Sequence, residues 1–209
     1  MTKQEKIARY EKLNEQAQRG QVLFVGSSLM EMFPVEKLFR EREIPIAVYN
    51  RGIGGFVIAE LERALDVCVL DLAPRRIFIN IGTNDLNEAS LTMEELVRRY
   101  ERVLDRIAEH LPSAEIYLMA YYPINQEAAT EEMKPCLRVR TNARICEANA
   151  AVQQMAKRRG LRYIDVNDVL KDEQGRLKAE YTIEGMHIRE EGYRAILDDL
   201  IPYVLEPAW

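Results

Sequence analysis

The stretch Val22-Leu23-Phe24-Val25-Gly26-Ser27-Ser28 joins a wholly apolar run to a small polar turn. An uninterrupted apolar run of this length is typical of a strand that is buried on both faces, as in a parallel sheet. Four more strand-like runs follow along the chain, at residues 46–49, 76–81, 115–120 and 161–164. The sequence therefore predicts five strands of one parallel sheet.

Helical patterns lie between these runs. The clearest covers residues 92–111, where apolar residues recur on one face, Thr92 and Glu95 match a capping box, and Pro112 ends the pattern. The same periodicity is found in residues 3–19, 56–70, 136–159 and 190–204. Strands that alternate with helices are joined by right-handed crossovers. We therefore expect a three-layer α/β/α, flavodoxin-like fold around the five-stranded parallel sheet.

Length and composition favour one domain. The chain has 209 residues and contains no repeat, low-complexity tract or linker that would divide it. Residues 1–20 are expected to hold an amphipathic helix, which could serve as the interface of a homo-oligomer, and the core is expected at about residues 21–204. The longest loop is expected at residues 122–135, which contain two prolines and many polar residues.

Charge and cysteine usage exclude several classes of partner. A net charge of -5 gives no support for binding to nucleic acid or to an anionic membrane. The three cysteines are odd in number and lack the spacing of metal ligands, so no metal site is expected and a reducing compartment is favoured. No signal peptide or membrane-spanning run is recognised, and the expected location is the cytoplasm.

Four polar segments follow the predicted strands or lie in the last loop that can reach them. In a parallel α/β sheet, ligands bind outside the carboxyl ends of the strands. The segments supply a hydroxyl, an imidazole and a carboxylate, which are the parts of a serine hydrolase. In chain order they are residues 26–29, residues 50–55, residues 82–85 and the pair Glu184 and His187.

Each segment has a structural interpretation as well. Serine is a common N-cap, glycine-rich runs form tight strand-to-helix turns, and Asn-Asp pairs are ordinary in turns. A histidine can be buried and satisfied by hydrogen bonds, although the chain has only two histidines, so imidazole chemistry has few possible places. No segment alone decides between structure and chemistry.

In order along the chain, the four segments resemble the sequence blocks of the SGNH hydrolases, the GDSL-type esterases and acylhydrolases. The resemblance covers residues 21–204, and its blocks are Gly26-Ser27-Ser28-Leu29, Asn50-Arg51-Gly52-Ile53-Gly54-Gly55, Gly82-Thr83-Asn84-Asp85 and Glu184-Gly185-Met186-His187.

The resemblance implies a role for five residues. Ser28 matches the family nucleophile and His187 its general base, and Glu184 stands where the family usually has an aspartate. The oxyanion hole is implied to consist of the backbone N–H groups of Ser28 and Gly55 and the side-chain amide of Asn84. No metal and no organic cofactor is implied.

Two departures from the family pattern bear on these roles. Ser27 replaces an aspartate that usually precedes the nucleophile but is not the triad acid. Glu184 carries one methylene more than aspartate, which displaces its carboxylate by about an ångström, and errors of that size can be costly to catalysis. The alternative is that Glu184 faces solvent, while a backbone carbonyl or water orients His187.

Other residues give weaker signals. Tyr121 and Tyr122 follow the fourth predicted strand, where they could line a substrate pocket or simply pack at the strand end. Arg138, Arg140 and Arg144 fall at helical spacing, which is more typical of a solvated face than of an anion site.

The expected function is that of a serine esterase. We expect hydrolysis of short acyl esters, acetyl esters foremost, of a small carbohydrate or metabolite through an acyl-enzyme intermediate. The alternatives are a lysophospholipase or thioesterase of the same family and a non-catalytic binding module on the same scaffold. A flavodoxin-like phosphate or nucleotide binder is disfavoured, because the loop after the first strand lacks the Ser, Thr and Gly residues that cradle a phosphate.

The block positions predict which serine reacts. Ser28→Ala should abolish both ester hydrolysis and labelling by a fluorophosphonate, whereas Ser27→Ala should retain most of both, because only the third residue of the first block should point into the site. An inactive Ser27→Ala variant beside an active Ser28→Ala variant would show that the first block is misaligned.

Overall fold

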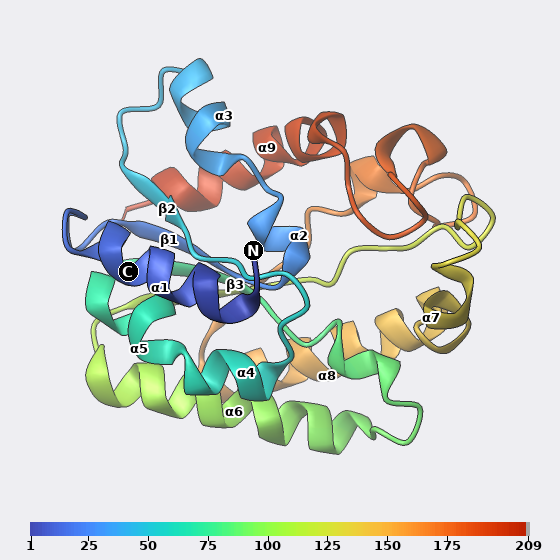
Figure 1. Ribbon diagram of the computed structural model, residues 1–209, viewed down its shortest axis with the longest axis horizontal. Helices are drawn as coiled ribbons and strands as arrows, with labels where there is room; N and C mark the ends of the chain where they lie inside the picture. Colours follow the sequence, from blue (N-terminus) through green and yellow to red (C-terminus); the bar gives the residue numbers. More distant parts are fainter. Residues whose placement is uncertain (208–209) are drawn as a thin grey trace.

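The computed structural model describes residues 1–207, which are built around a five-stranded parallel sheet (Figure 1). The strand order is β2-β1-β3-β4-β5 and every pair is parallel. The predicted fold class is therefore confirmed. The strands are β1 (Val22–Gly26), β2 (Val48–Asn50), β3 (Arg76–Asn80), β4 (Glu115–Met119) and β5 (Arg162–Ile164).

Helices cover both faces of the sheet, as Figure 1 shows. One face packs against α2 (Ser28–Glu31), α3 (Val35–Glu41) and α9 (Glu190–Leu205). The other face packs against α4 (Ile58–Arg63), α5 (Leu65–Cys68), α6 (Met93–His110) and α8 (Asn142–Arg159). The remaining helices are α1 (Lys3–Asn14) and α7 (Lys134–Val139), with short 3₁₀ turns at η1 (Leu70–Leu72), η2 (Asp85–Asn87), η3 (Asp168–Leu170) and η4 (Ala179–Tyr181).

An aromatic ladder crosses the three central strands on the α9 face. Phe24, Phe78 and Tyr117 are partners in the strand register, and each is fully buried. Their rings stack with centroid separations of 4.7 Å between Phe24 and Phe78 and 4.8 Å between Phe78 and Tyr117. Stacked aromatic pairs contribute about 0.5–1.5 kcal/mol beyond their buried area, so the ladder helps to fix the register of β1, β3 and β4.

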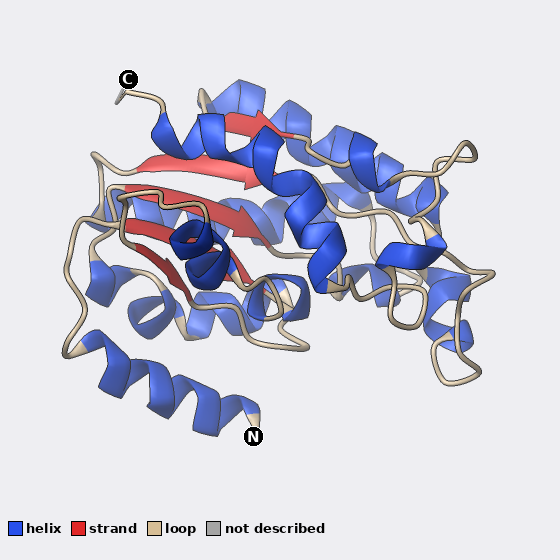
Figure 2. Cartoon of the chain, turned by 90° about the horizontal axis from the view of Figure 1, so that it is seen from above, coloured by secondary structure: helices blue, strands red, loops and turns tan. Residues whose placement is uncertain are grey.

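The carboxyl ends of the strands lie along one edge of the sheet, where all five arrows point in Figure 2. The turns that follow β1, β2 and β3 are neighbours there, because β1 lies between β2 and β3. These turns carry three of the four polar segments that the sequence singled out.

Two predicted helices are divided in the structure. Residues 56–70 form α4 and α5, with a break at Ala64, and then enter a 3₁₀ turn. Residues 136–159 are divided between α7 and α8, because Thr141 acts as the N-cap of α8 and its side chain accepts a hydrogen bond from the N–H of Arg144. The periodicity spans this break, so it did not indicate that Arg140 lies outside both helices.

Smaller differences concern the first part of the chain. Helix α1 ends at Asn14, five residues before the predicted end. The strand predicted at residues 46–49 lies at residues 48–50, and the short helix α3 was not predicted. At the start of α6, the Thr92 side chain accepts from the Glu95 N–H, whereas the Glu95 carboxylate pairs with Arg98 and Arg99 instead of closing a capping box.

Arg76 forms hydrogen bonds that connect the sheet to the end of α9. Its side chain is fully buried at the start of β3, where Nε donates to Oε2 of Glu115 at 2.6 Å. The remaining guanidinium hydrogens reach the backbone carbonyls of residues 203, 204 and 206 at 2.7–3.0 Å. Arg76 thereby satisfies carbonyls at the end of α9 that have no partner inside the helix.

Removal of Arg76 should destabilise the fold. Arg76→Met leaves the Glu115 carboxylate buried without this partner, and breaking a buried pair costs about 3–5 kcal/mol. The control is Arg158→Met, which removes an exposed arginine 3.5 Å from Glu101 and should cost less than about 1 kcal/mol. Urea unfolding followed by circular dichroism measures both. Equal losses in the two variants would contradict the role assigned to Arg76.

Candidate active site

Ser28 is placed at the edge of the sheet by the turn that follows β1. Ser27 is the N-cap of α2 and is 1% exposed, whereas Ser28 is the first residue of that helix and is half-buried. The N–H of a first helical residue has no acceptor within its helix. Ser28 therefore offers both its hydroxyl and its N–H to the space above the sheet edge.

His187 belongs to a tight loop that precedes α9. Thr182 and Ile188 pair as an antiparallel bridge, and the N–H of Ile183 donates to the His187 carbonyl at 2.9 Å. The Thr182 hydroxyl accepts from the N–H of Gly185 at 2.8 Å and donates to the same carbonyl at 3.2 Å. These bonds fix the loop that carries both Glu184 and His187.

Three side chains meet across this loop and α2. His187 Nε2 lies 3.0 Å from Ser28 Oγ, and His187 Nδ1 lies 2.6 Å from Glu184 Oε1. Because Nδ1 faces a carboxylate, it carries the proton, and Nε2 is left as an acceptor for the Ser28 hydroxyl. The structure therefore brings the three predicted residues together as a hydroxyl, an imidazole and a carboxylate in series.

The Glu184 side chain, one methylene longer than aspartate, still forms its hydrogen bond to the His187 imidazole. Its Oε1 also accepts from the backbone N–H of His187 at 3.1 Å, and the Glu184 side chain is only 14% exposed. The alternative in which Glu184 faces solvent does not occur. The turn depends on Gly185, at which φ is +100° and a Cβ would lie 2.7 Å from the Asn125 carbonyl oxygen.

The glycine loop after β2 is held by the first helix. From α1, Lys3 Nζ donates to the Gly55 carbonyl at 2.9 Å, and Tyr10 donates to the Gly52 carbonyl at 2.7 Å. Glu31 of α2 accepts from the N–H of Gly54 at 2.6 Å. Gly55 has a φ of +75°, and among residues 1–207 its N–H has no acceptor. The N–H of Gly54 is therefore occupied, whereas the next N–H of the loop, at Gly55, is available.

Asn84 is attached to the same loop. Its amide nitrogen donates to the Phe56 carbonyl at 2.9 Å, and its Oδ1 accepts from Nη2 of Arg140 at 2.8 Å. A primary amide has two hydrogens. One hydrogen of Asn84 is therefore left for a further acceptor, while both ends of the amide are fixed.

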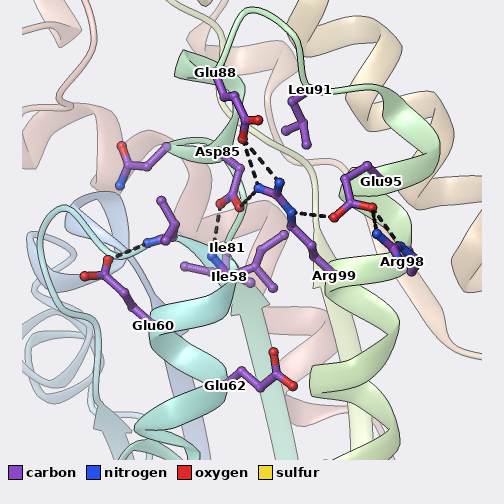
Figure 3. Close-up of polar contacts among 12 residues, drawn as sticks. Ile58, Glu60, Glu62, Ile81, Asp85, Glu88, Leu91, Glu95, Arg98 and Arg99 are labelled. Atoms are coloured by element: carbon purple, nitrogen blue, oxygen red, sulfur yellow. Dashed lines mark hydrogen bonds and ion pairs between the residues drawn. The ribbon is translucent and has the colours of Figure 1, made fainter.

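Asp85 supports the start of α4 behind this loop. Its carboxylate is 3% exposed and accepts from the N–H of Ile58 at 3.0 Å and from Arg99 at 3.4 Å (Figure 3). Burial raises the pKa of this carboxyl group, against the opposing effect of those hydrogen bonds. Asp85 thus holds the η2 turn to the start of α4 and has a structural role.

Tyr121 and Tyr122 are each 1% exposed and enter opposite cores of the sheet, which favours packing at the strand end over the lining of a substrate pocket. The weaker expectation for Arg140 is wrong. Arg140 is not on a solvated face, because the break before α8 turns it inward, where it is also 1% exposed.

Sequence reasoning also missed the residues that hold the glycine loop. Lys3, Tyr10 and Glu31 lie in patterns that are ordinary for amphipathic helices, so nothing in the sequence marked them. Glu31 has one signal in retrospect, since it lies three residues after Ser28, on the same short helix.

The rest of the described chain adds little to the site. Residues 1–207 contain no cluster of three or more His, Cys, Asp or Glu side chains that could hold a metal ion. None of the helices in that part of the chain is long and apolar enough to cross a membrane.

The chain matches the model of a known protein family. Residues 33–195 match the model of the GDSL-like lipase/acylhydrolase family, in a range that begins after Ser28. The chain belongs to this family. The family resemblance inferred from the four sequence blocks is therefore confirmed.

The chain is similar to several known proteins. A Streptococcus pneumoniae protein, provisionally described as a platelet activating factor, has 30% sequence identity and a TM-score of 0.85 over 97% of this chain and 92% of its own. The platelet-activating factor acetylhydrolase IB subunit alpha2 of Rattus norvegicus is 24% identical over 88% of this chain and 77% of its own length. The N-acylneuraminate cytidylyltransferase of Escherichia coli is 24% identical over 93% of this chain, which spans only 42% of that protein.

The contact between Glu184 and His187 makes a prediction about turnover. Glu184→Gln should preserve the fold but lower kcat for ester hydrolysis by about a hundredfold or more, because a neutral amide neither fixes the imidazole tautomer nor stabilises the imidazolium. Glu184→Asp retains the charge and should lose less. Steady-state kinetics on folded variants measures both. A fully active Glu184→Gln variant would reduce the site to the pair Ser28 and His187.

Proposed function

We propose that this chain is a serine ester hydrolase that works through an acyl-enzyme intermediate. The observation that carries the proposal is the series of contacts from Ser28 Oγ to His187 Nε2, 3.0 Å, and from His187 Nδ1 to Glu184 Oε1, 2.6 Å. A hydroxyl becomes an effective nucleophile when a base within hydrogen-bond reach removes its proton and a third group orients that base.

The proposed reaction has two steps. Ser28 Oγ attacks the carbonyl carbon of the ester as His187 Nε2 takes the hydroxyl proton, and the tetrahedral intermediate expels the alcohol, which receives that proton. Water then attacks the acyl-enzyme with His187 again as the base, and the acid leaves as Ser28 regains its proton. Glu184 remains ionised throughout and stabilises the imidazolium.

Three donors are proposed to bind the oxyanion of each intermediate. They are the N–H of Ser28, the N–H of Gly55 and the second amide hydrogen of Asn84, which have no acceptor among residues 1–207. Donors that are fixed before the reaction stabilise developing charge without a reorganisation cost. The hydrogen bonds that hold Gly54, Gly55 and Asn84 support this assignment.

The proposed substrates are short acyl esters, acetyl esters foremost, of a small carbohydrate or metabolite. The name of the rat relative, an acetylhydrolase, supports an acetyl group. A long acyl chain would need a continuous apolar surface, since each buried methylene contributes about 0.8 kcal/mol. Residues 126–132, in the long loop after β4, are exposed or half-exposed and mostly polar, so they do not supply such an apolar surface.

The three free cysteines are compatible with a reducing location such as the cytoplasm. A binding module that had lost catalysis would have no need for the contacts between Ser28, His187 and Glu184. These contacts favour catalysis over the non-catalytic alternative.

The decisive experiment is a panel of p-nitrophenyl esters from acetate to palmitate, followed by acetylated sugars. We expect kcat/KM to be highest for acetate and to fall as the acyl chain lengthens. Ser28→Ala should remove the activity, as the control for a contaminating esterase. Rates that climb from acetate to decanoate would assign the chain to the lipase or lysophospholipase type instead, and a lack of hydrolysis with no fluorophosphonate labelling would refute the proposed function.

A further inference from the structure

Arg140 is a buried cation whose side-chain hydrogen bonds go to neutral groups. It is 1% exposed, and among residues 1–207 it has no carboxylate within ion-pair distance, although the nearby Asp85 carboxylate, which accepts a hydrogen bond from Arg99, opposes the lowering of its pKa by burial. Its guanidinium donates to Asn84 Oδ1 at 2.8 Å from Nη2, to Asn87 Oδ1 at 3.2 Å from Nε, and to the sulfur of Met186 from Nη1. Buried charges are normally paired, because the desolvation of an unpaired one is costly. Stabilisation of the fold therefore does not explain why a guanidinium is buried against neutral groups at this position.

The three partners of Arg140 are all parts of the candidate site. Asn84 and Asn87 belong to the turn after β3, and Met186 immediately precedes His187. Arg140 itself lies in the break between α7 and α8. One guanidinium thus joins the turn that carries the oxyanion amide to the loop that carries the general base.

The contact to Asn84 decides which way its amide points. With Oδ1 facing the guanidinium, the NH₂ group faces the Phe56 carbonyl and the space beside Gly55. A flipped amide would place two N–H donors against a cation and an oxygen against the Phe56 carbonyl, so it is excluded electrostatically. A cationic donor on the oxygen also polarises the amide and strengthens its N–H groups as donors.

We propose that Arg140 is a positioning residue for the oxyanion hole, which fixes and polarises the Asn84 amide. The proposal rests on the proposed function and deepens it. The chain of hydrogen bonds runs from the guanidinium through the Asn84 amide to the substrate oxygen, so the positive charge is coupled through that amide to the negative charge that develops when the tetrahedral intermediate forms. Such a group lowers the barrier without tightening the binding of the neutral ester.

Burial lowers the pKa of Arg140, but a guanidinium still keeps its proton at neutral pH. Lysine is a poor substitute here, because a compact ammonium cannot donate to Asn84 and Asn87 at once from one planar group. The hydrogen bonds at position 140 therefore require arginine, although lysine carries the same charge.

The first test is a kinetic cycle of Arg140→Met, Asn84→Ala and the double variant, with Arg138→Met as the matched control. Arg138 is an exposed arginine two residues away. We expect Arg140→Met to lower kcat on the order of tenfold or more with KM changed by less than about twofold, and Arg138→Met to change neither. In the Asn84→Ala background, Arg140→Met should cause almost no further loss, since it acts through that amide.

Three outcomes would overturn the proposal: unchanged turnover in Arg140→Met, a loss confined to KM, or losses that multiply fully in the double variant. Circular dichroism establishes that each variant is folded. Should Arg140→Met not fold, Arg140→Lys takes its place in the same cycle. A severalfold loss of kcat in Arg140→Lys that vanishes in the Asn84→Ala background supports the proposal. An Arg140→Lys variant with the kcat of the wild-type protein overturns it.

A second measurement does not depend on activity. The side-chain amide of Asn84 gives a pair of ¹⁵N-correlated NMR signals that Asn84→Ala identifies by their loss. We expect this pair to shift in Arg140→Met and to stay in place in Arg138→Met, whereas an unmoved pair in Arg140→Met would overturn the contact. If the wild-type protein hydrolysed no ester, the proposed function would fail, yet these signals would still test the link between Arg140 and Asn84.

Discussion

The backbone hydrogen bonds that pair β1 in parallel with β2 and β3 are the constraint on which the site depends. Parallel pairing places the carboxyl ends of all three strands at one edge, so the turns that carry Ser28, Gly55 and Asn84 become neighbours. A change in the order or direction of one strand would separate these groups while leaving each local turn intact. The aromatic ladder of Phe24, Phe78 and Tyr117 stabilises this register from the core.

Polar contacts hold the turns at this edge of the sheet in addition to burial. Helix α1 has no fully buried residue, yet two of its side chains hold carbonyls of the glycine loop. Glu31 occupies the Gly54 N–H and also pairs with Lys6, so one carboxylate joins α1, α2 and the loop. These contacts leave the Gly55 N–H as the available donor of the loop, in agreement with the position implied by the family blocks.

The strands and the polar turns could be predicted from the sequence because their signals are local. An apolar run followed by Gly-x-Ser or Gly-x-Asn-Asp contains both the strand and its turn within a few residues. The distance between Glu184 and His187 is also local, although only the structure shows that the extra methylene is accommodated. The burial of Arg140 was not predictable in this way. It depends on the helix break at Thr141 and on Asn84, 56 residues away along the chain. The sequence also did not predict which core Tyr121 and Tyr122 enter, because packing decides which face of a sheet receives a strand-end side chain.

The reacting pair is assembled from the two ends of the chain. Ser28 and His187 are separated by 159 residues, and their contact joins the turn after β1 to the loop before α9. Contacts of such long sequence separation form late, since the entropy of closing the intervening chain must first be offset by other native interactions. Partly folded forms with β1 paired but α9 undocked would therefore hold a serine with no base beside it. The series of contacts from Ser28 through His187 to Glu184 therefore exists only once α9 and the loop before it are docked on the sheet.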